Sequence, residues 1–321
     1  MIRLRSTTLA ATAAALVFSL AGAASATTAP ARLDRGSPAP AANGDLLITI
    51  NGNLYLIAAN GSNKRQLTSG GGISDAAFSP DGRRIVFGRG SGTNADLFVM
   101  KADGTNVVNW TRTAGVGETN PAWSPDGRRI AFTRNATANS GDGIAVMNAA
   151  PGASATLIKR NRHTANSANL YSEPVWSPSG NRIAYQDVLD WEGSCTPVYV
   201  RQMTPAGANI SMPEMLGYTP DYDPTGNWLA ATEEDCGIYW LVKRNLSTGQ
   251  KVNITRPNDS PADWYPVWSP DGAKVAYSRS RSAGGGWVED LAIVGTGGGA
   301  YTRILMAGPG QNIRPRDWRA R

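Results

Sequence analysis

The residues of this chain that are best suited to chemistry are carboxylates, because its 321 residues include a single histidine, His163. A Ser-His-Asp or Cys-His nucleophilic site would need that histidine as its base. His163 lies in a polar stretch, and the sequence contains no G-x-S-x-G turn. Clustered histidine ligands for zinc or manganese are likewise ruled out. We therefore expect no catalytic residue, no cofactor and no histidine-ligated metal.

Four carboxylates recur at fixed distances before an aromatic residue. Asp75 and Glu173 stand three residues before one, and Glu118 and Asp263 stand five before one. If these positions cluster, they could form an acidic ring for a metal ion or a basic peptide, or they could cap loop backbone. Paired carboxylates can also hydrolyse glycosides, but only at particular separations that a sequence does not give.

The carboxylates are positioned by a repeated sequence, of which residues 121–134 (PAWSPDGRRIAFTR) are the clearest copy. The copy predicts a strand ending at Trp123, a tight turn at Ser124-Pro125-Asp126-Gly127, and a second strand over residues 129–134. Proline presets φ, aspartate bonds its own backbone, and glycine accepts the left-handed conformation of a bulged hairpin loop. The sequence therefore predicts one hairpin per copy.

Four further copies of this sequence follow the same register. They begin at residues 76, 174, 220 and 266 and read AAFSPDGRRIVFGR, PVWSPSGNRIAYQD, PDYDPTGNWLAATE and PVWSPDGAKVAYSR. The aromatic residues before the turns are spaced by 45, 53, 46 and 46 residues. Such a period, with one hairpin per repeat, indicates a radial array of four-stranded units. We assign no ligand to the recurring turn aspartates Asp81, Asp126 and Asp271.

The two ends of the array complete one unit. Residues 45–50, 53–57 and 64–67 predict the second, third and fourth strands of a unit, and residues 313–318 predict a lone first strand. The 274 residues from Asp45 to Trp318 give about 46 residues for each of six units. We therefore predict an all-β, six-bladed propeller of four-stranded antiparallel blades, closed by pairing of its termini. The recurring prolines suit an innermost edge strand, and the aromatics suit interblade packing.

The W-S-P-D-G-x-x-I-A-F repeat closely resembles the PD40, or TolB-like (WD40-like), propeller repeat. The resemblance extends from about Asp45 to Trp318 and implies the fold, but not a function, because such propellers host unrelated activities. In the family's namesake the propeller follows an N-terminal α/β domain, acts in the cell envelope and binds a peptidoglycan-associated lipoprotein. Here about 18 residues separate the predicted signal peptide from the propeller, so we expect that domain to be absent and do not carry its role over.

The N-terminal region predicts export. Residues 1–26 combine arginines, an apolar run and the small-residue cleavage site Ala24-Ser25-Ala26, as a secretory signal peptide does. An uncleaved anchor is the alternative. Residues 27–44 predict a flexible leader, and residues 45–321 the propeller. We expect a secreted monomer, extracellular or periplasmic, without stable membrane insertion after cleavage. Its net charge of +6 comes from scattered residues, so we expect no nucleic-acid partner.

The predicted binding surface is the propeller mouth that carries the second-to-third and fourth-to-first strand connections. These connections vary in length and composition, as recognition surfaces do, whereas the S-P-D-G turns are nearly identical. The aromatics on this face either anchor a ligand or cover blade edges. The candidate ligand-binding residues are Asp75, Glu118, Glu173, Trp191, Asp263, Trp264, Tyr265 and Arg314.

Cys195 and Cys236, the two cysteines of the chain, precede the third strands of adjacent units. An even number of cysteines in an exported chain favours a disulfide. Corresponding strands lie ~10 Å or more apart, beyond the ~7 Å that bridged Cα atoms allow. The loop at residues 188–195 is long enough to cross that gap. The alternative is two unrelated thiols.

These observations predict a secreted, non-enzymatic propeller that binds a protein or cell-envelope ligand, glycan included, at the channel mouth. The alternative is a carbohydrate-active enzyme, a glycan hydrolase or lyase, that uses the mouth carboxylates. A third hypothesis is a structural or interaction module without a defined small ligand.

Overall fold

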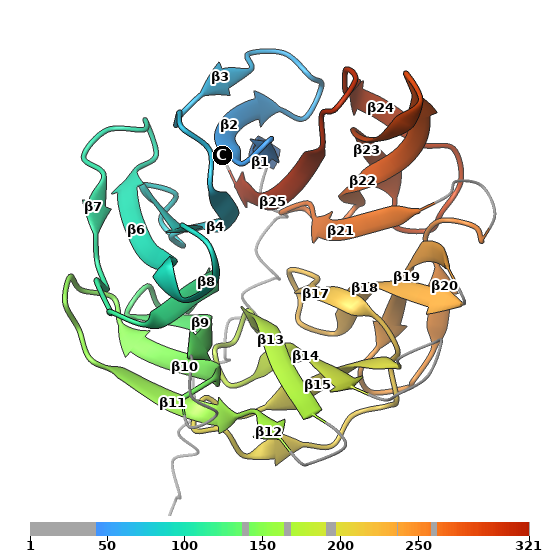
Figure 1. The fold of residues 1–321 in the computed structure, drawn as a ribbon. Coiled ribbons are helices and arrows are strands. Elements are labelled where there is room, and N and C mark those ends of the chain that lie inside the picture. Colours follow the sequence, from blue (N-terminus) through green and yellow to red (C-terminus); the bar gives the residue numbers. More distant parts are fainter. Residues whose placement is uncertain are drawn as a thin grey trace, which may run out of the picture. The chain divides into compact units, whose positions relative to one another are not determined.

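In the computed structural model, the described residues are 43–136, 141–163, 168–190, 197–235, 237–257 and 262–320. They form six antiparallel sheets arranged around a central axis (Figure 1). Five sheets have four strands, and the third along the chain has an additional short strand, β12, at its inner edge. The predicted six-bladed propeller is confirmed.

Each blade is described from its innermost strand outward. Blade 1 consists of β4 (Ile73–Phe78), β5 (Arg84–Arg89), β6 (Asp96–Lys101) and β7 (Val108–Asn109), with the short 3-10 helix η1 (Gly92–Asn94) between β5 and β6. Blade 2 consists of β8 (Val116–Trp123), β9 (Arg129–Ala136), β10 (Gly143–Asn148) and β11 (Ala155–Arg160). Blade 3 consists of β12 (Arg162–His163), β13 (Ala168–Trp176), β14 (Ile183–Asp190), β15 (Val198–Met203) and β16 (Asn209–Ile210).

Blades 4 and 5 follow the same order, and blade 6 joins the two ends of the propeller. Blade 4 consists of β17 (Tyr218–Tyr222), β18 (Trp228–Asp235), β19 (Ile238–Asn245) and β20 (Lys251–Asn253). Blade 5 consists of β21 (Asp263–Trp268), β22 (Lys274–Ala283), β23 (Gly286–Gly295) and β24 (Thr302–Leu305). Blade 6 consists of β25 (Ile313–Ala320), β1 (Asn43–Ile50), β2 (Asn53–Ala58) and β3 (Arg65–Gln66).

The S-P-D-G turns of blades 1, 2 and 5 follow the predicted chemistry. In blade 2, the Ser124 hydroxyl donates to Asp126 at 2.5 Å, and Asp126 accepts the backbone N–H two residues later at 3.1 Å. Gly127 has a φ of 68°, which lies in the left-handed region that favours glycine. The same bonds form around Asp81 and Asp271. These aspartates therefore hold the turns, as predicted.

The hydrophobic core consists of six clusters, each between two consecutive blades. The aromatic residue that ends each innermost strand lies in one of them and is 4–7% exposed. The Arg84 guanidinium of blade 1 lies 4.6 Å from the Trp123 ring of blade 2, and Arg129 lies 4.7 Å from Trp176 of blade 3. Apolar burial and cation–π stacking therefore join the blades, which confirms the predicted interblade role of the aromatics.

The ring closes where the ends of the propeller share blade 6 (Figure 1). β25 pairs with β1 in a register that places Trp318 opposite Leu46. The indole N–H of Trp318 donates to the Gly44 carbonyl at 3.3 Å, and Arg319 forms an ion pair with Asp45. The predicted closure is confirmed, although the fourth strand of this blade is shorter than the predicted residues 64–67.

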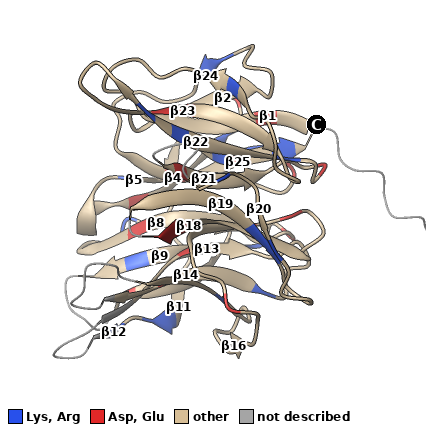
Figure 2. Cartoon of the chain, turned by 90° about the vertical axis from the view of Figure 1, so that its right-hand side faces the viewer, with Lys and Arg blue, Asp and Glu red and all other residues tan. Residues whose placement is uncertain are grey.

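The described part of the chain contains no helix that is long and apolar enough to cross a membrane. Lys and Arg residues lie on several blades in the side view of Figure 2 and do not gather on one.

Candidate functional site

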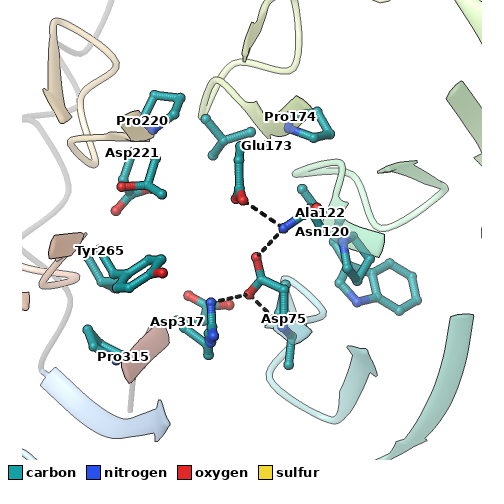
Figure 3. Close-up of a pocket in the computed structure, with 18 of the residues that line it drawn as sticks. Asp75, Asn120, Ala122, Glu173, Pro174, Pro220, Asp221, Tyr265, Pro315 and Asp317 are labelled. Atoms are coloured by element: carbon teal, nitrogen blue, oxygen red, sulfur yellow. Dashed lines mark hydrogen bonds and ion pairs between the residues drawn. The ribbon is translucent and has the colours of Figure 1, made fainter. Parts of the chain in front are cut away.

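The six innermost strands enclose a cavity of about 240 Å³ on the axis of the ring (Figure 3). Two rows of residues line it. We call the residues three positions before each aromatic the mouth row: Asp75, Asn120, Glu173, Thr219, Tyr265 and Pro315. We call the residues one position before each aromatic the deep row: Ala77, Ala122, Val175, Asp221, Val267 and Asp317.

The backbone of the mouth row is unusual. Asn120, Glu173, Thr219 and Tyr265 have φ values of 50°, 53°, 49° and 56°, in the left-handed region. Each lies at a register shift between the innermost strand and its neighbour. A β-bulge redirects side chains, and a non-glycine residue in this conformation costs of order 1–3 kcal/mol. The fold therefore maintains local strain where it directs polar side chains into the channel.

A hydrogen-bonded network joins three blades at the mouth row (Figure 3). The Asn120 amide donates to Glu173 Oε1 at 2.8 Å and to Asp75 Oδ2 at 3.3 Å. The Arg316 guanidinium lies 3.6 Å from Asp75 Oδ1. Burial in the channel, followed by the charge of Asp75, raises the pKa of Glu173 to about 8, and Arg316 only partly opposes this. Glu173 is therefore largely protonated at neutral pH and can release a proton when a cation approaches.

The deep row is apolar except for two aspartates, each of which bonds the next blade. Asp221 Oδ2 accepts the Trp268 backbone N–H at 2.8 Å, and Asp317 Oδ2 accepts the Phe78 backbone N–H at 2.7 Å. Burial raises the pKa of Asp221 to about 8, and the charge of Asp317 adds to the shift. Burial also raises the pKa of Asp317 to about 6. Both carboxyls therefore tie blades together and lie in the channel lining.

The described lining of the cavity thus has four carboxyl groups, from Asp75, Glu173, Asp221 and Asp317, against the single guanidinium of Arg316. A lining with surplus acid groups suits a cationic group, such as a lysine or arginine side chain. In the described ranges, no three His, Cys, Asp or Glu side chains come together as a metal site.

Three of the predicted site residues line the cavity: Asp75, Glu173 and Tyr265. Arg314 lies beside it and not in its lining, because its guanidinium stacks 4.9 Å from the Tyr265 ring and donates to Glu289 at 2.7 Å. Tyr265 thus makes cation–π contacts with two arginines, since the Arg316 guanidinium also lies 5.2 Å from its ring.

Glu118 and Asp263 are not at the mouth, which corrects the prediction for both. They are 2% and 1% exposed. Glu118 bonds the side chains of Thr111 and Thr113, and burial raises its pKa. Asp263 lies 3.6 Å from Arg279 in a buried ion pair. The bulge explains the correction, because its extra residue reverses the alternation of the strand and turns positions five before the aromatic away from the channel.

Trp264 lies on the mouth face in a half-buried aromatic cluster between blades 4 and 5. Its ring is 4.0 Å from Tyr239 and 5.8 Å from Tyr218. The hydroxyls of both tyrosines donate to Glu234. Trp264 therefore packs against a blade edge and stays partly exposed on the mouth face. Trp191 and the two cysteines, Cys195 and Cys236, lie outside the described residues.

Exposed apolar side chains also occur on the mouth face. They lie near the starts of innermost strands or on connections at that end of the blades. Their exposed fractions are 37% for Leu170 and Ile238, 64% for Trp287 and 61% for Met306. Trp287 follows the tight turn between β22 and β23, the longest hairpin among the described strands. The mouth therefore offers apolar contacts around an acidic channel.

The prediction from sequence missed five polar lining residues: Asn120, Thr219, Asp221, Arg316 and Asp317. Asn120 occupies the same repeat position as Asp75 and Glu173. Asp221 and Asp317 occupy a position at which the other copies have alanine or valine. This departure from the repeat is a sequence feature from which both aspartates could have been predicted as channel residues.

Comparisons with known proteins agree with this architecture. Residues 45–163 match the family model of the TolB beta propeller domain, PD40. No curated protein sequence matches the chain. The structure is similar to TolB from Acinetobacter baumannii, with a TM-score of 0.64 and 17% identity over 86% of this chain and 66% of that one.

Two other solved structures share the fold at lower identity. One is a chain of a nidogen/laminin complex, with a TM-score of 0.57 and 12% identity over 84% of this chain and 98% of that one. The other is an oligogalacturonate lyase in complex with manganese, with a TM-score of 0.51 and 15% identity over 76% of this chain and 82% of that one. Identities this low show a common fold alone.

Proposed function

We propose that this chain is a TolB-like PD40 β-propeller that acts as an exported, non-catalytic binding protein, because residues 45–163 match the family model and the fold is that of TolB. Its ligand, a protein or another component of the cell envelope, docks on the mouth face and places a cationic group in the channel. The candidate contacts are Asp75, Glu173 and Tyr265 in the channel, with Trp264 and Arg314 beside it.

The observation that carries the proposal is the surplus of carboxyl groups in the channel. Burial raises the pKa of Glu173 and of Asp221 to about 8, so these carboxyls hold protons at neutral pH. A cationic side chain that enters the channel favours the ionised carboxylates and displaces these protons. Binding is therefore coupled to proton release and weakens as the pH falls.

The two faces of the propeller differ in what they offer a ligand. The hairpin turns on the opposite face use their aspartates internally, as the bonds around Asp126 show. The mouth face has exposed Trp287 and Met306 and blade-specific loops around the acidic channel. Aromatic and methionine side chains are enriched where proteins bind one another. The cavity of about 240 Å³ has room for one side chain, so most of the contact area lies on the rim.

A glycan hydrolase or lyase is the second candidate, because Glu173 has the raised pKa of a general acid and shares Asn120 with Asp75. A screen for release of reducing or unsaturated ends from plant, algal and bacterial polysaccharides separates the two functions. Turnover that is lost in Glu173→Gln would favour the enzyme over the binding protein.

Capture from native material tests the binding function. The mature chain is immobilised and incubated with envelope extract and culture medium, and the retained material is quantified by mass spectrometry. Glu173→Ala and Trp264→Ala should reduce retention of the specific ligand at least tenfold. Asp126→Ala, on the opposite face, should leave it unchanged, and the reverse pattern would reject the assignment of the mouth.

A further inference from the structure

A second cavity, of about 480 Å³, lies between the outer strands of blades 2 and 3, apart from the channel. Neighbouring blades diverge toward the outside of the ring, so the gap between them widens there. Lys159 of β11 forms the side of blade 2, and residues from β12 to β16 and the two residues after β16 form the side of blade 3; Figure 1 shows where these strands lie in the ring. Both sides present charged side chains, and the side of blade 3 also presents apolar ones.

The charges in this interblade cavity are unbalanced. Lys159, Arg162 and Arg201 line it, with Asp187 as the one carboxylate among the described lining residues. Asp187 lies 3.6 Å from the Arg201 guanidinium, so part of its charge is already matched. Burial lowers the pKa of Lys159. The charges of Arg162 and Arg201 lower it further, and the charge of Asp187 opposes this shift. An anion placed between these three cations would relieve their repulsion.

Lys159 is held in place for such a contact. Its ammonium group donates to Asn209 Oδ1 at 2.6 Å and lies 5.0 and 5.4 Å from the rings of Tyr171 and Tyr185. These two rings are buried and meet edge to face at 5.6 Å. They form a rigid base on which the Lys159 ammonium is held by cation–π contact.

The lining also contains an unsatisfied donor. Gln202 is 1% exposed, and its Oε1 accepts from Arg182 at 3.3 Å. Its Nε2 has no hydrogen-bond partner within the described part of the chain. Buried amide donors are normally paired, so this one requires an acceptor that the described residues do not supply. An oxygen-rich molecule in the cavity would provide one.

We propose that the interblade cavity binds a small anionic molecule of monosaccharide size, whose carboxylate or phosphate lies between Lys159, Arg162 and Arg201. Its body packs against the partly exposed apolar lining residues Leu189, Ile210 and Met212, and its hydroxyls bond Asn209, Ser211 and Gln202. The volume lies within the range of small-molecule sites. This site is independent of the ligand proposed for the mouth.

Isothermal titration calorimetry on the full chain at low ionic strength tests the proposal with three probes: D-glucuronate, glucose 6-phosphate and glucose. We expect saturable binding of at least one of the two anions and none of glucose. A response to glucuronate alone or to glucose 6-phosphate alone identifies carboxylate or phosphate as the charged group. Arg201→Gln and Lys159→Gln should each weaken binding at least tenfold.

Arg128→Gln is the matched control, because it removes the same charge from an exposed hairpin turn of blade 2. It should leave the affinity unchanged. The proposal is overturned if neither anion binds saturably, if glucose binds as well as they do, or if Arg128→Gln weakens binding as much as Arg201→Gln. Circular dichroism melting confirms that each variant is folded, and a shift of the Gln202 side-chain amide resonance on titration reports the site directly.

Discussion

The carboxylates of the hairpin turns and those of the channel belong to the same blades but have opposite environments. Hydrogen bonds from the Ser124 hydroxyl and a backbone N–H lower the pKa of exposed Asp126. Burial raises the pKa of Glu173 and of Asp221 to about 8. The first kind of carboxylate is ionised to stabilise a turn. The second kind retains a proton that a ligand can displace.

The turn aspartates therefore serve the fold, and the channel carboxyls form the candidate site. The turn aspartates come with the repeat and occur wherever the S-P-D-G sequence occurs. The channel carboxyls differ from blade to blade, and Asp221 and Asp317 replace the small apolar residues of the other copies. Where a residue departs from its repeat and sits in a costly environment, a role beyond folding is the natural interpretation.

Removing the closing strand should have the largest effect, because the channel depends on an intact ring. Deletion of residues 313–321 removes β25, the deep-row Asp317 and Trp318, which is 4% exposed. Loss of a buried tryptophan alone costs about 3–5 kcal/mol, a large part of a domain's stability. Thermal and urea unfolding should show a strongly destabilised or unfolded chain. Unchanged melting would contradict the closure.

The predicted disulfide comes next in size. A bond between Cys195 and Cys236 would link adjacent mouth loops and stabilise the fold by about 2–4 kcal/mol through loss of unfolded-chain entropy. The exported protein, alkylated under denaturing conditions without reductant and analysed by mass spectrometry, should carry no label on either cysteine. Two labelled cysteines would show that the disulfide does not form.

A pair of single substitutions tests the contrast between turn and channel directly. Asp126→Ala removes two hydrogen bonds that hold a hairpin turn, so we expect a loss of about 1–2 kcal/mol at pH 7. Glu173→Gln keeps the shape of a group that is already largely protonated, so stability at pH 7 should change by less than about 0.5 kcal/mol. Equal losses in urea unfolding would mean that the two environments are alike.

The last predicted effect is a dependence of stability on pH. Glu173 and Asp221 have a raised pKa in the folded chain, so between about pH 4 and pH 8 the folded state binds more protons than the unfolded state. Their contribution to stability is complete below pH 4 and is lost as the pH rises through 8. The melting temperature should therefore fall as the pH rises from 5 to 8.5.

The double variant Glu173→Gln/Asp221→Asn provides the control for that slope. Its side chains do not titrate, so its melting temperature should change less over the same range. A slope as steep as that of the parent chain would place the titrating groups elsewhere.

The fold could be predicted almost completely from the sequence, because one hairpin signature recurs in register and the termini supply complementary strands. The candidate site could be predicted only in part. Asp75 and Glu173, three residues before the aromatic, line the channel as the repeat predicts. Glu118, five residues before it, does not, because the bulge between Thr119 and Ala122 reverses the side-chain alternation of the strand. The left-handed backbone at Thr219 and Tyr265 has no sequence signal, because neither residue type favours that conformation.

The most direct test of the central claim is the titration of Glu173 itself. The chain has seven glutamates, so ¹³C-labelling of glutamate side chains gives a resolvable carboxyl spectrum, and Glu173→Gln assigns the resonance. We predict a titration midpoint near pH 8 that falls when a lysine-bearing ligand occupies the channel. A midpoint near 4.5, as in a solvated glutamate, would contradict the claim that the channel holds a displaceable proton.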